Sequence, residues 1–169
     1  MDQQKVEGLE QIEGSHCKMK SVIMLKGRPA GVCKVSFAKP GKHGHVKCNI
    51  VAQDLLKPDK KYQHMCPGHE MIPVPVVKKY DLIISYFEEE KGQDAEVTGI
   101  CTMTEDDEEI TINFDGTNEK HVKALKLFKE IEENDEDKEV VLSIVQCTVG
   151  LKGPYNFEHA VDKVNVRDA

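Results

Sequence analysis

The chain has 169 residues, of which 39% are hydrophobic and 31% charged, with no tryptophan and a formal net charge of −7. This is enough apolar material for one domain or two small ones. No uninterrupted apolar segment approaches the roughly 18 residues that a bilayer-spanning helix needs, and Met1–Gly14 lacks the basic and then apolar pattern of a signal peptide. We therefore expect a cytoplasmic protein that does not enter a membrane.

The cysteines fit a reducing compartment. They are scattered, form no Cys-x-x-Cys pair, and several lie within apolar alternating runs, where a free thiol behaves as a small hydrophobe. Cys66-x-x-His69 is the nearest approach to a zinc half-site, but no second half follows it. We expect a reduced protein without a metal or other cofactor. The six cysteines are Cys17, Cys33, Cys48, Cys66, Cys101 and Cys147.

Charge is divided unevenly along the chain. Residues 1–79 contain 14 Lys and Arg against 7 Asp and Glu, whereas residues 80–169 contain 9 against 23. A basic half inside an acidic chain indicates an anionic partner, and RNA is the leading candidate. The alternative is a solvated surface whose asymmetry has no function.

The first residues predict little structure before a run of short strands. Residues 1–15 are polar, and we expect a flexible tail, although Val6, Leu9 and Ile12 could form a short helical stripe on a partner. Strands are predicted over 20–25, on both sides of residues 39–45, and over 62–66. Short strands without a helical period predict a small SH3-like β-barrel.

The centre of this half is a predicted hairpin with a basic tip. Residues 33–37 and 46–50 alternate between apolar and polar, and Pro40, Gly41 and Gly44 lie between them. Lys42 should project from the apex, available for modification or for a deep contact. A phosphate-binding loop is excluded, since that motif needs glycine at position 36 and a hydroxyl at position 43.

Two other interpretations of the hairpin stay open. A metal site on His43 and His45 would need further ligands from elsewhere. A plain solvated basic hairpin needs nothing more. A hydrolase with a histidine base lacks a recognisable nucleophile and orienting acid, so we expect no catalytic residues.

The segment 71–77 is the predicted domain boundary. It contains Pro73 and Pro75, which favour a stiff extended connector over an edge strand, and the charge changes sign just after it. The prediction is a flexible tail over 1–15, an SH3-like basic domain over 16–77 and an acidic domain over 78–169.

The acidic domain has the element order of an OB-fold. Strands are predicted over 80–87, 95–103 and 110–114, a helix over about 118–133, and a strand over 139–149. The spacing of Phe157, Ala160, Val161 and Val164 predicts a closing helix after Pro154. The net charge of −14 on residues 80–169 opposes RNA binding by the bare surface of this domain. Its acidic runs are solvated turns or face a basic ribosomal protein.

The basic half also resembles a known family. Lys26-Gly27-Arg28-Pro29, Gly41-Lys42-His43-Gly44-His45, Lys60-Lys61-Tyr62, Cys66-Pro67 and Val74-Pro75 occur in this order. Their order and spacing are similar to the hypusine-containing translation factors, eukaryotic initiation factor five A and its archaeal relatives. The resemblance is dense from about residue 16 to 79. Pro40 departs from it, because the family usually carries a small hydroxylated residue there, and the stretch from Cys66 to Val74 is altered.

The resemblance implies an SH3-like barrel followed by an OB-fold with one intervening helix, in a ribosome-binding factor that is not an enzyme. It implies that Lys42 receives an aminobutyl group from spermidine and becomes hypusine. Its partners would be the ribosome, peptidyl tRNA, deoxyhypusine synthase and deoxyhypusine hydroxylase, without DNA. Gly41, His43, Gly44 and His45 would be recognised by the modifying enzymes.

The factor would help slow peptide bonds to form, notably at prolines, and aid termination. We expect four basic side chains to position the barrel on the RNA backbone. The alternative is an unmodified RNA-binding module that uses the same basic hairpin. The four side chains are Arg28, Lys34, Lys39 and Lys47.

Overall fold

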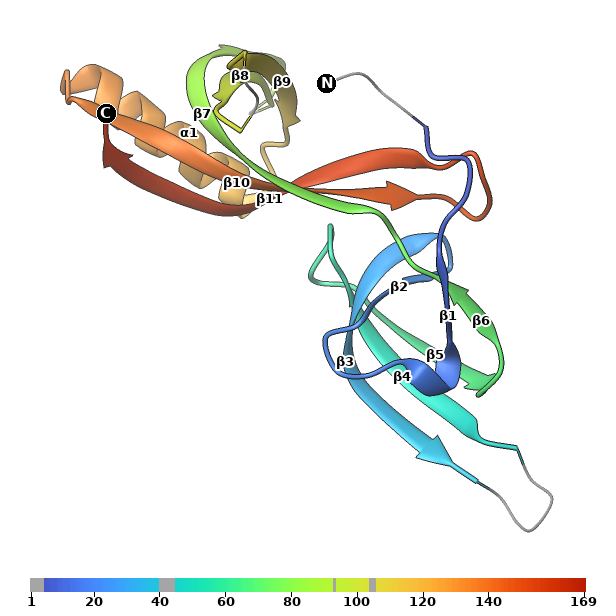
Figure 1. The fold of residues 1–169 in the computed structure, drawn as a ribbon. Coiled ribbons are helices and arrows are strands. Elements are labelled where there is room, and N and C mark those ends of the chain that lie inside the picture. Colours follow the sequence, from blue (N-terminus) through green and yellow to red (C-terminus); the bar gives the residue numbers. More distant parts are fainter. Residues whose placement is uncertain (1–4, 40–44, 93, 104–105) are drawn as a thin grey trace. The chain divides into compact units, whose positions relative to one another are not determined.

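The computed structural model describes residues 5–39, 45–92, 94–103 and 106–169 (Figure 1). They form two compact units. The N-terminal unit comprises the chain up to Lys78 together with Gln146–His159, and the C-terminal unit comprises Lys79–Val145 and Ala160–Ala169. The chain is mostly β-structure in both units, and the part that the structure describes contains no helix long and apolar enough to cross a membrane.

The N-terminal unit is built from short antiparallel strands. Four consecutive strands pair in the order β2-β3-β4-β5, and a separate two-stranded sheet joins β1 to β6 (Figure 1). A short 3-10 helix, η1 (Gly14–His16), follows β1. The strands are β1 (Gln11–Glu13), β2 (Val22–Leu25), β3 (Arg28–Ala38), β4 (Lys47–Asp54), β5 (Lys61–Pro67) and β6 (Met71–Pro73).

Local sequence explains the first tight turn. Leu25 pairs with Arg28, so only Lys26 and Gly27 connect β2 to β3. Both have positive φ angles, 54° and 77°, as the turns that suit the twist of a two-residue hairpin require. Glycine adopts this conformation without strain, so the turn is complete at Gly27 and β3 begins at Arg28.

Alternation along β3, β4 and β5 separates an inner from an outer face. The inner face forms a closed apolar core, as expected of the predicted SH3-like barrel, and the outer face stays polar. The buried core residues are Cys17, Ile23, Leu25, Ala30, Val32, Cys48, Ile50, Ala52, Cys66 and Ile72.

Two segments of this unit differ from the prediction. Within the predicted flexible tail, Val6 bridges Tyr155, and Gln11–Glu13 pairs with β6. The predicted connector over 71–77 begins as the edge strand Met71–Pro73. Proline is tolerated there because an edge strand has backbone groups that need no partner. Pairing of two segments far apart in sequence therefore orders both.

The C-terminal unit has the predicted element order up to its last element. Its five-stranded sheet has the order β11-β10-β7-β8-β9, and the helix α1 (Glu119–Glu133) lies between β9 and β10 in the chain (Figure 1). This is the OB-fold arrangement that the sequence predicts. The strands are β7 (Val77–Glu89), β8 (Ala95–Cys101), β9 (Glu108–Phe114), β10 (Lys138–Val149) and β11 (Asn156–Asp168).

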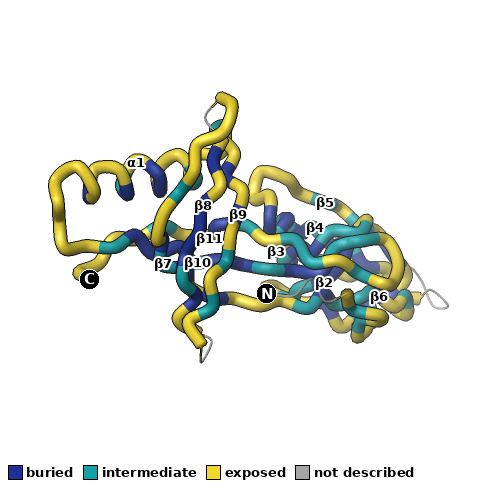
Figure 2. The backbone as a smooth tube through the Cα atoms, turned by 90° about the horizontal axis from the view of Figure 1, so that it is seen from above, coloured by how far each residue is buried: buried dark blue, intermediate teal, exposed yellow. Residues whose placement is uncertain are grey.

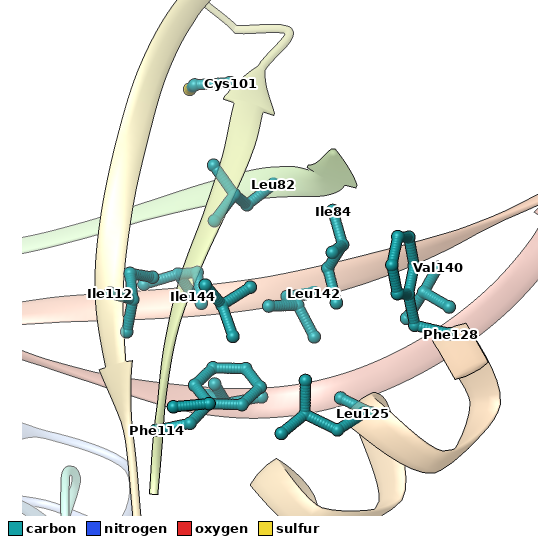
Figure 3. Close-up of a cluster of buried hydrophobic side chains, with 14 of the residues drawn as sticks. Leu82, Ile84, Cys101, Ile112, Phe114, Leu125, Phe128, Val140, Leu142 and Ile144 are labelled. Atoms are coloured by element: carbon teal, nitrogen blue, oxygen red, sulfur yellow. The ribbon is translucent and has the colours of Figure 1, made fainter. Parts of the chain in front are cut away.

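One apolar face of α1 closes the core of this unit. Asn118 caps the helix, its side chain accepting hydrogen bonds from the backbone N–H groups of Lys120 and His121. Figure 2 shows α1 buried along one side and exposed along the other. Leu125 and Phe128 point toward the sheet residues Leu142 and Phe114 (Figure 3). Ala124 and Ile131 complete the buried face of the helix.

The predicted closing helix is wrong, because Asn156–Asp168 is the strand β11. The spacing of Phe157, Val161 and Val164 fits a helix face, but β-branched valines also favour strands. β10 offers a row of backbone hydrogen-bonding groups along its edge, and β11 pairs with that edge. Tertiary pairing therefore overrides the local spacing.

That the two predicted domains fold independently stays a prediction. The first division between the compact units falls between Lys78 and Lys79, next to the predicted limit at residue 77. The segment Gln146–His159, which the sequence assigns to the acidic domain, is grouped with the N-terminal unit. Local composition gave no sign of this grouping.

Candidate functional site

The β3–β4 hairpin carries the candidate site. The last described residue pair of the hairpin is Ala38 opposite Lys47. Lys39 and His45 are the last described residues before and after the tip. The structure therefore confirms the two strands that the alternating sequence predicts. The predicted modification site and its neighbours lie outside the described residues; these are Pro40, Gly41, Lys42, His43 and Gly44.

Two of the predicted RNA-binding lysines share one face of the hairpin. Lys47 is opposite Ala38, and Lys34 lies four residues before Ala38 on β3. Side chains alternate along a strand and match across a pair, so Lys34 and Lys47 point to the same face, roughly 13 Å apart along the strands. Both are exposed, as is Lys39 at the end of β3.

The rest of this outer face contains polar, apolar and basic side chains, among them Asn49, Met65 and Lys61. Asn49 on β4 accepts a hydrogen bond at 2.9 Å from the side-chain amide of Gln63 on β5. Among the residues of β3, β4 and β5, the only carboxylate is Asp54. The outward lysines therefore have no acidic neighbour on these strands, and the face attracts anions.

Arg28 differs from the three lysines, because two carboxylates already hold its guanidinium. Its Nε donates to Asp54 at 2.9 Å, and its Nη1 donates to Glu158 at 2.5 Å. Its side chain is only 21% exposed. Burial would lower the pKa of Arg28, but the hydrogen bonds that it donates to Asp54 and Glu158 raise it. Arg28 is therefore a structural cation in this fold, and its contact with RNA stays a prediction.

Asp54 organises the opposite end of the hairpin from the tip. Its carboxylate is fully buried and accepts hydrogen bonds from the hydroxyl of Tyr62 at 2.7 Å and from the backbone N–H groups of Leu56 and Lys57. Burial alone would raise the pKa of Asp54, but these bonds and Arg28 hold it below its ordinary value. An ionised Asp54 thus fixes the loop that leads from β4 to β5.

The turn between β5 and β6 supports the tip end of the hairpin. The N–H of Gly68 donates to the carbonyl of Val46 at 2.7 Å, and the carbonyl of Gly68 accepts from the N–H of Ser15 at 3.0 Å. A Cβ at Gly68 would lie 3.2 Å from both the Val46 oxygen and the Ser15 Cβ. Only a residue without a side chain fits between them comfortably, so the backbone itself fixes where β4 begins.

His45 faces the same turn. Its ring lies edge-on to the ring of His69, with the centroids 6.3 Å apart. A small hollow of about 220 Å³ lies beside them, lined by His45, Val46, Gly68 and His69 together with Glu13 and Ser15 of the preceding segment. The described part of the tip is therefore supported on one side and exposed on the other.

Sequence analysis missed the residues that hold the hairpin in place. Gly68 gave no signal beyond its place after a proline, and its role depends on contacts with residues more than 20 positions away. Asp54 stood out only as an acidic residue in a basic stretch. That isolated charge was the signal that could have identified it as a partner of Arg28.

Comparison with known proteins supports the resemblance over the same region. Residues 10–70 match the family described as "Translation initiation factor 5A-like, N-terminal". A stretch of 59 residues is 44% identical to eukaryotic translation initiation factor 5A of Spodoptera exigua, covering 35% of this chain and 36% of that protein. Another of 67 residues is 39% identical to factor 5A-1 of Caenorhabditis elegans, covering 40% and 41%. Each match thus spans well under half of its relative's length.

The fold agrees over nearly the whole chain. A family protein from Naegleria fowleri superposes with a TM-score of 0.70 at 19% identity, covering 94% of this chain and 99% of that one. The factor from Methanococcus jannaschii gives 0.60 at 17%, covering 94% and 96%. At such identities these structures show the architecture alone. Over residues 10–70 the sequence is similar to the translation initiation factor 5A-like family, and the fold of the whole chain is the one seen in these two solved structures.

Proposed function

We propose that this protein is a translation factor that acts on the ribosome and carries hypusine at Lys42. The observation that carries the proposal is the sequence Gly41-Lys42-His43-Gly44-His45, which stands between two paired, basic strands inside the family match. In this proposal a modifying enzyme reaches the amine of Lys42 within that sequence. Gly41, His43, Gly44 and His45 are the surroundings that the enzyme would recognise.

The chemistry of the modification suits this geometry. An aminobutyl group from spermidine, later hydroxylated, lengthens the side chain and adds a second amine. The extended cation can reach into an RNA-walled site, where phosphate oxygens attract it. We propose that it approaches the acceptor end of the peptidyl tRNA and favours peptide bonds that form slowly, as at prolines, as well as termination.

The exposed lysines on the outer face would hold the barrel against RNA. Lys34 and Lys47 point to one side, Lys39 lies next to the tip, and none has an acidic neighbour on β3, β4 or β5. Contacts with phosphates position a protein without requiring a base sequence. In this proposal the protein is a substrate of deoxyhypusine synthase and deoxyhypusine hydroxylase and catalyses no reaction itself.

A second candidate function is an unmodified RNA-binding module. The outer face with Lys34 and Lys47 favours it, because this face needs no modified lysine to bind phosphates. Intact mass of the protein purified from its own cells separates the two. The proposal expects a mass gain of one hydroxylated aminobutyl group on Lys42, and an unmodified mass supports the module.

A Lys42→Arg variant tests the functional half of the proposal. Arginine keeps the charge and still contacts phosphate, but it cannot act as the amine nucleophile that accepts the aminobutyl group. The variant should fold and bind ribosomes with the same salt dependence, stay unmodified, and fail to stimulate synthesis on proline-rich messages. Lys39→Arg, next to the tip, is the matched control and should retain both modification and stimulation. Full stimulation by unmodified Lys42→Arg would refute the hypusine proposal.

A further inference from the structure

A cluster of four metal-ligand side chains lies near the tip end of the hairpin and belongs to no part of the proposed function. His64, Cys66 and Glu70 each offer one ligand atom, and these atoms all lie within 4.8 Å of one another. His64 and Cys66 alternate along β5 and share its inner face. Glu70 returns to them from the turn before β6. The turn is tight, because the N–H of Glu70 donates to the Pro67 carbonyl at 3.0 Å.

A second thiol completes the set. Cys48 on β4 is the direct cross-strand partner of Cys66, so the two side chains point to the same face. The thiols lie within hydrogen-bonding reach of each other. The result is two sulfur donors, one imidazole and one carboxylate, all from β4, β5 and the turn that follows.

The surroundings close the cluster on one side and leave it open on the other. Cys48 and Cys66 are buried, with 1% and 6% of their surface exposed. Gly14 covers them, and a Cβ there would lie 2.9 Å from the Cys66 sulfur and 3.6 Å from the Cys48 sulfur. The side chains of His64 and Glu70 remain 34% and 41% exposed. An ion can therefore enter past His64 and Glu70 and reach the buried sulfurs.

Electrostatics also favour a cation at this place, because the cluster contains the Glu70 carboxylate beside thiols that bind metal ions as thiolates. No basic side chain other than His64 is paired with Glu70 among the described contacts. A divalent cation would supply the missing positive charge and allow both thiols to ionise.

We propose that Cys48, His64, Cys66 and Glu70 bind a divalent cation of the zinc class. Such ions take tetrahedral sites of thiolate, imidazole and carboxylate ligands at about 2.0 to 2.3 Å, which places the donor atoms roughly 3.3 to 3.8 Å apart. The ligand atoms of His64, Cys66 and Glu70, within 4.8 Å of one another, need only a small contraction around the ion, and Cys48 would join them from its place opposite Cys66. His64 Nε2 and a Glu70 oxygen now share a hydrogen bond of 2.5 Å, and the ion would enter between them.

Sequence spacing points to a different histidine. Cys66-x-x-His69 has the spacing of a zinc half-site, but His69 is exposed and its ring faces His45. The fold brings His64 to the cluster instead, by strand alternation, and brings Cys48 by strand pairing. The expectation of a metal-free protein depended on finding a second half in the sequence, and pairing of β4 with β5 supplies one.

Cobalt provides the direct test, since thiolate ligands give Co²⁺ a near-ultraviolet charge-transfer band and a tetrahedral site gives strong visible bands. Metal-free full-length protein, kept reduced with a phosphine, should show both bands at one Co²⁺ per chain. Zn²⁺ should abolish them and raise the melting temperature. Binding should weaken as pH falls, because protons compete for the thiolates. A wild-type protein without the charge-transfer band at stoichiometric Co²⁺ overturns the proposal.

Ligand variants identify the set. His64→Ala and Glu70→Gln change partly exposed side chains that the fold tolerates, and each should weaken Co²⁺ binding by at least about tenfold. His69→Ala, three residues from Cys66, and Cys33→Ser, on an exposed thiol, are the matched controls and should bind as the wild type does. Loss of binding in His69→Ala with retention in His64→Ala would refute the assignment.

The thiol ligands have a test of their own. Cys48→Ser and Cys66→Ser should each reduce the charge-transfer intensity, and an unchanged band in both would refute the thiol ligands.

Discussion

Gly68 and Val46 are joined by a backbone hydrogen bond of 2.7 Å that ties the turn after β5 to the residue directly before β4. Val46 is the last residue before β4, so this bond fixes the point at which the hairpin leaves the barrel. The same turn carries Cys66 at one end and Glu70 at the other. The support of the candidate tip and the candidate metal site therefore share one short segment.

Gly68→Ala should disturb this support. The added methyl would lie 3.2 Å from the Val46 oxygen and from the Ser15 Cβ, and overpacking of this kind costs about 1 to 2 kcal/mol of unfolding free energy. We also expect slower modification of Lys42 by deoxyhypusine synthase in vitro. Gly31→Ala is the matched control, because its methyl would meet only Leu55 at an ordinary 3.5 Å. Equal stability of the two variants in urea unfolding would contradict the expectation.

Arg28→Met should destabilise the N-terminal unit by about 3 kcal/mol, the lower end of the cost of breaking a buried ion pair. It leaves the fully buried Asp54 carboxylate without its charged partner. Lys61→Met removes the same charge from an exposed position on β5. It should alter the free energy of unfolding by less than about 0.5 kcal/mol. Chemical denaturation measures both. A loss of stability in Arg28→Met as small as that in Lys61→Met would show that Arg28 is a free cation, as the sequence predicts.

How far the sequence predicts this region depends on the range of the interactions. Period-2 alternation is local, and it predicts β3 and β4 correctly. Asp54 lies 26 residues from Arg28, and Glu158 lies 130 residues from it. No pattern near Arg28 indicates either partner, so an arginine in a basic stretch was interpreted as an RNA ligand. The same limit explains β11, whose partner β10 outweighs a helical spacing.

Asp54 should also make stability depend on pH in acid. Its folded-state pKa is lower than its ordinary value, so the unfolded state binds the proton more readily. The stabilisation is complete above the ordinary carboxyl pKa of about 3.9 and is lost as pH falls through that value toward the folded pKa. Asp54→Asn should therefore be less stable at neutral pH and should lose less stability on acidification. Asp59→Asn, an exposed change nearby, should follow the wild-type curve. Parallel acid curves for all three proteins would contradict the prediction.

Gly99→Ala tests whether the two domains unfold separately, as the sequence predicts. A Cβ there would lie 2.6 Å from the Ile83 carbonyl oxygen and 2.7 Å from Leu82 in the core of the C-terminal unit. We expect a loss of about 3 kcal/mol, the upper end for overpacking. In calorimetry, one transition should move to lower temperature while the other, which Gly68→Ala shifts, stays in place. A single transition that moves as a whole with either variant would contradict independent domains.

The outward lysines give the sharpest test of how the barrel meets RNA. Each phosphate contact that a protein makes contributes roughly 0.7 to 0.9 to the slope of log affinity against log salt. Lys34→Ala with Lys47→Ala removes two exposed cations from one face, so ribosome binding should weaken and the slope should fall by about 1.5. Folding should be unaffected, because both side chains point to solvent.

The control is Lys57→Ala with Lys60→Ala, which removes the same charge from the loop at the far end of the hairpin. If the face of Lys34 and Lys47 is the contact, the control retains most of the affinity and most of the slope. Equal losses in the two double variants would show that net charge alone draws this domain to RNA, and would leave the orientation of the hairpin without support.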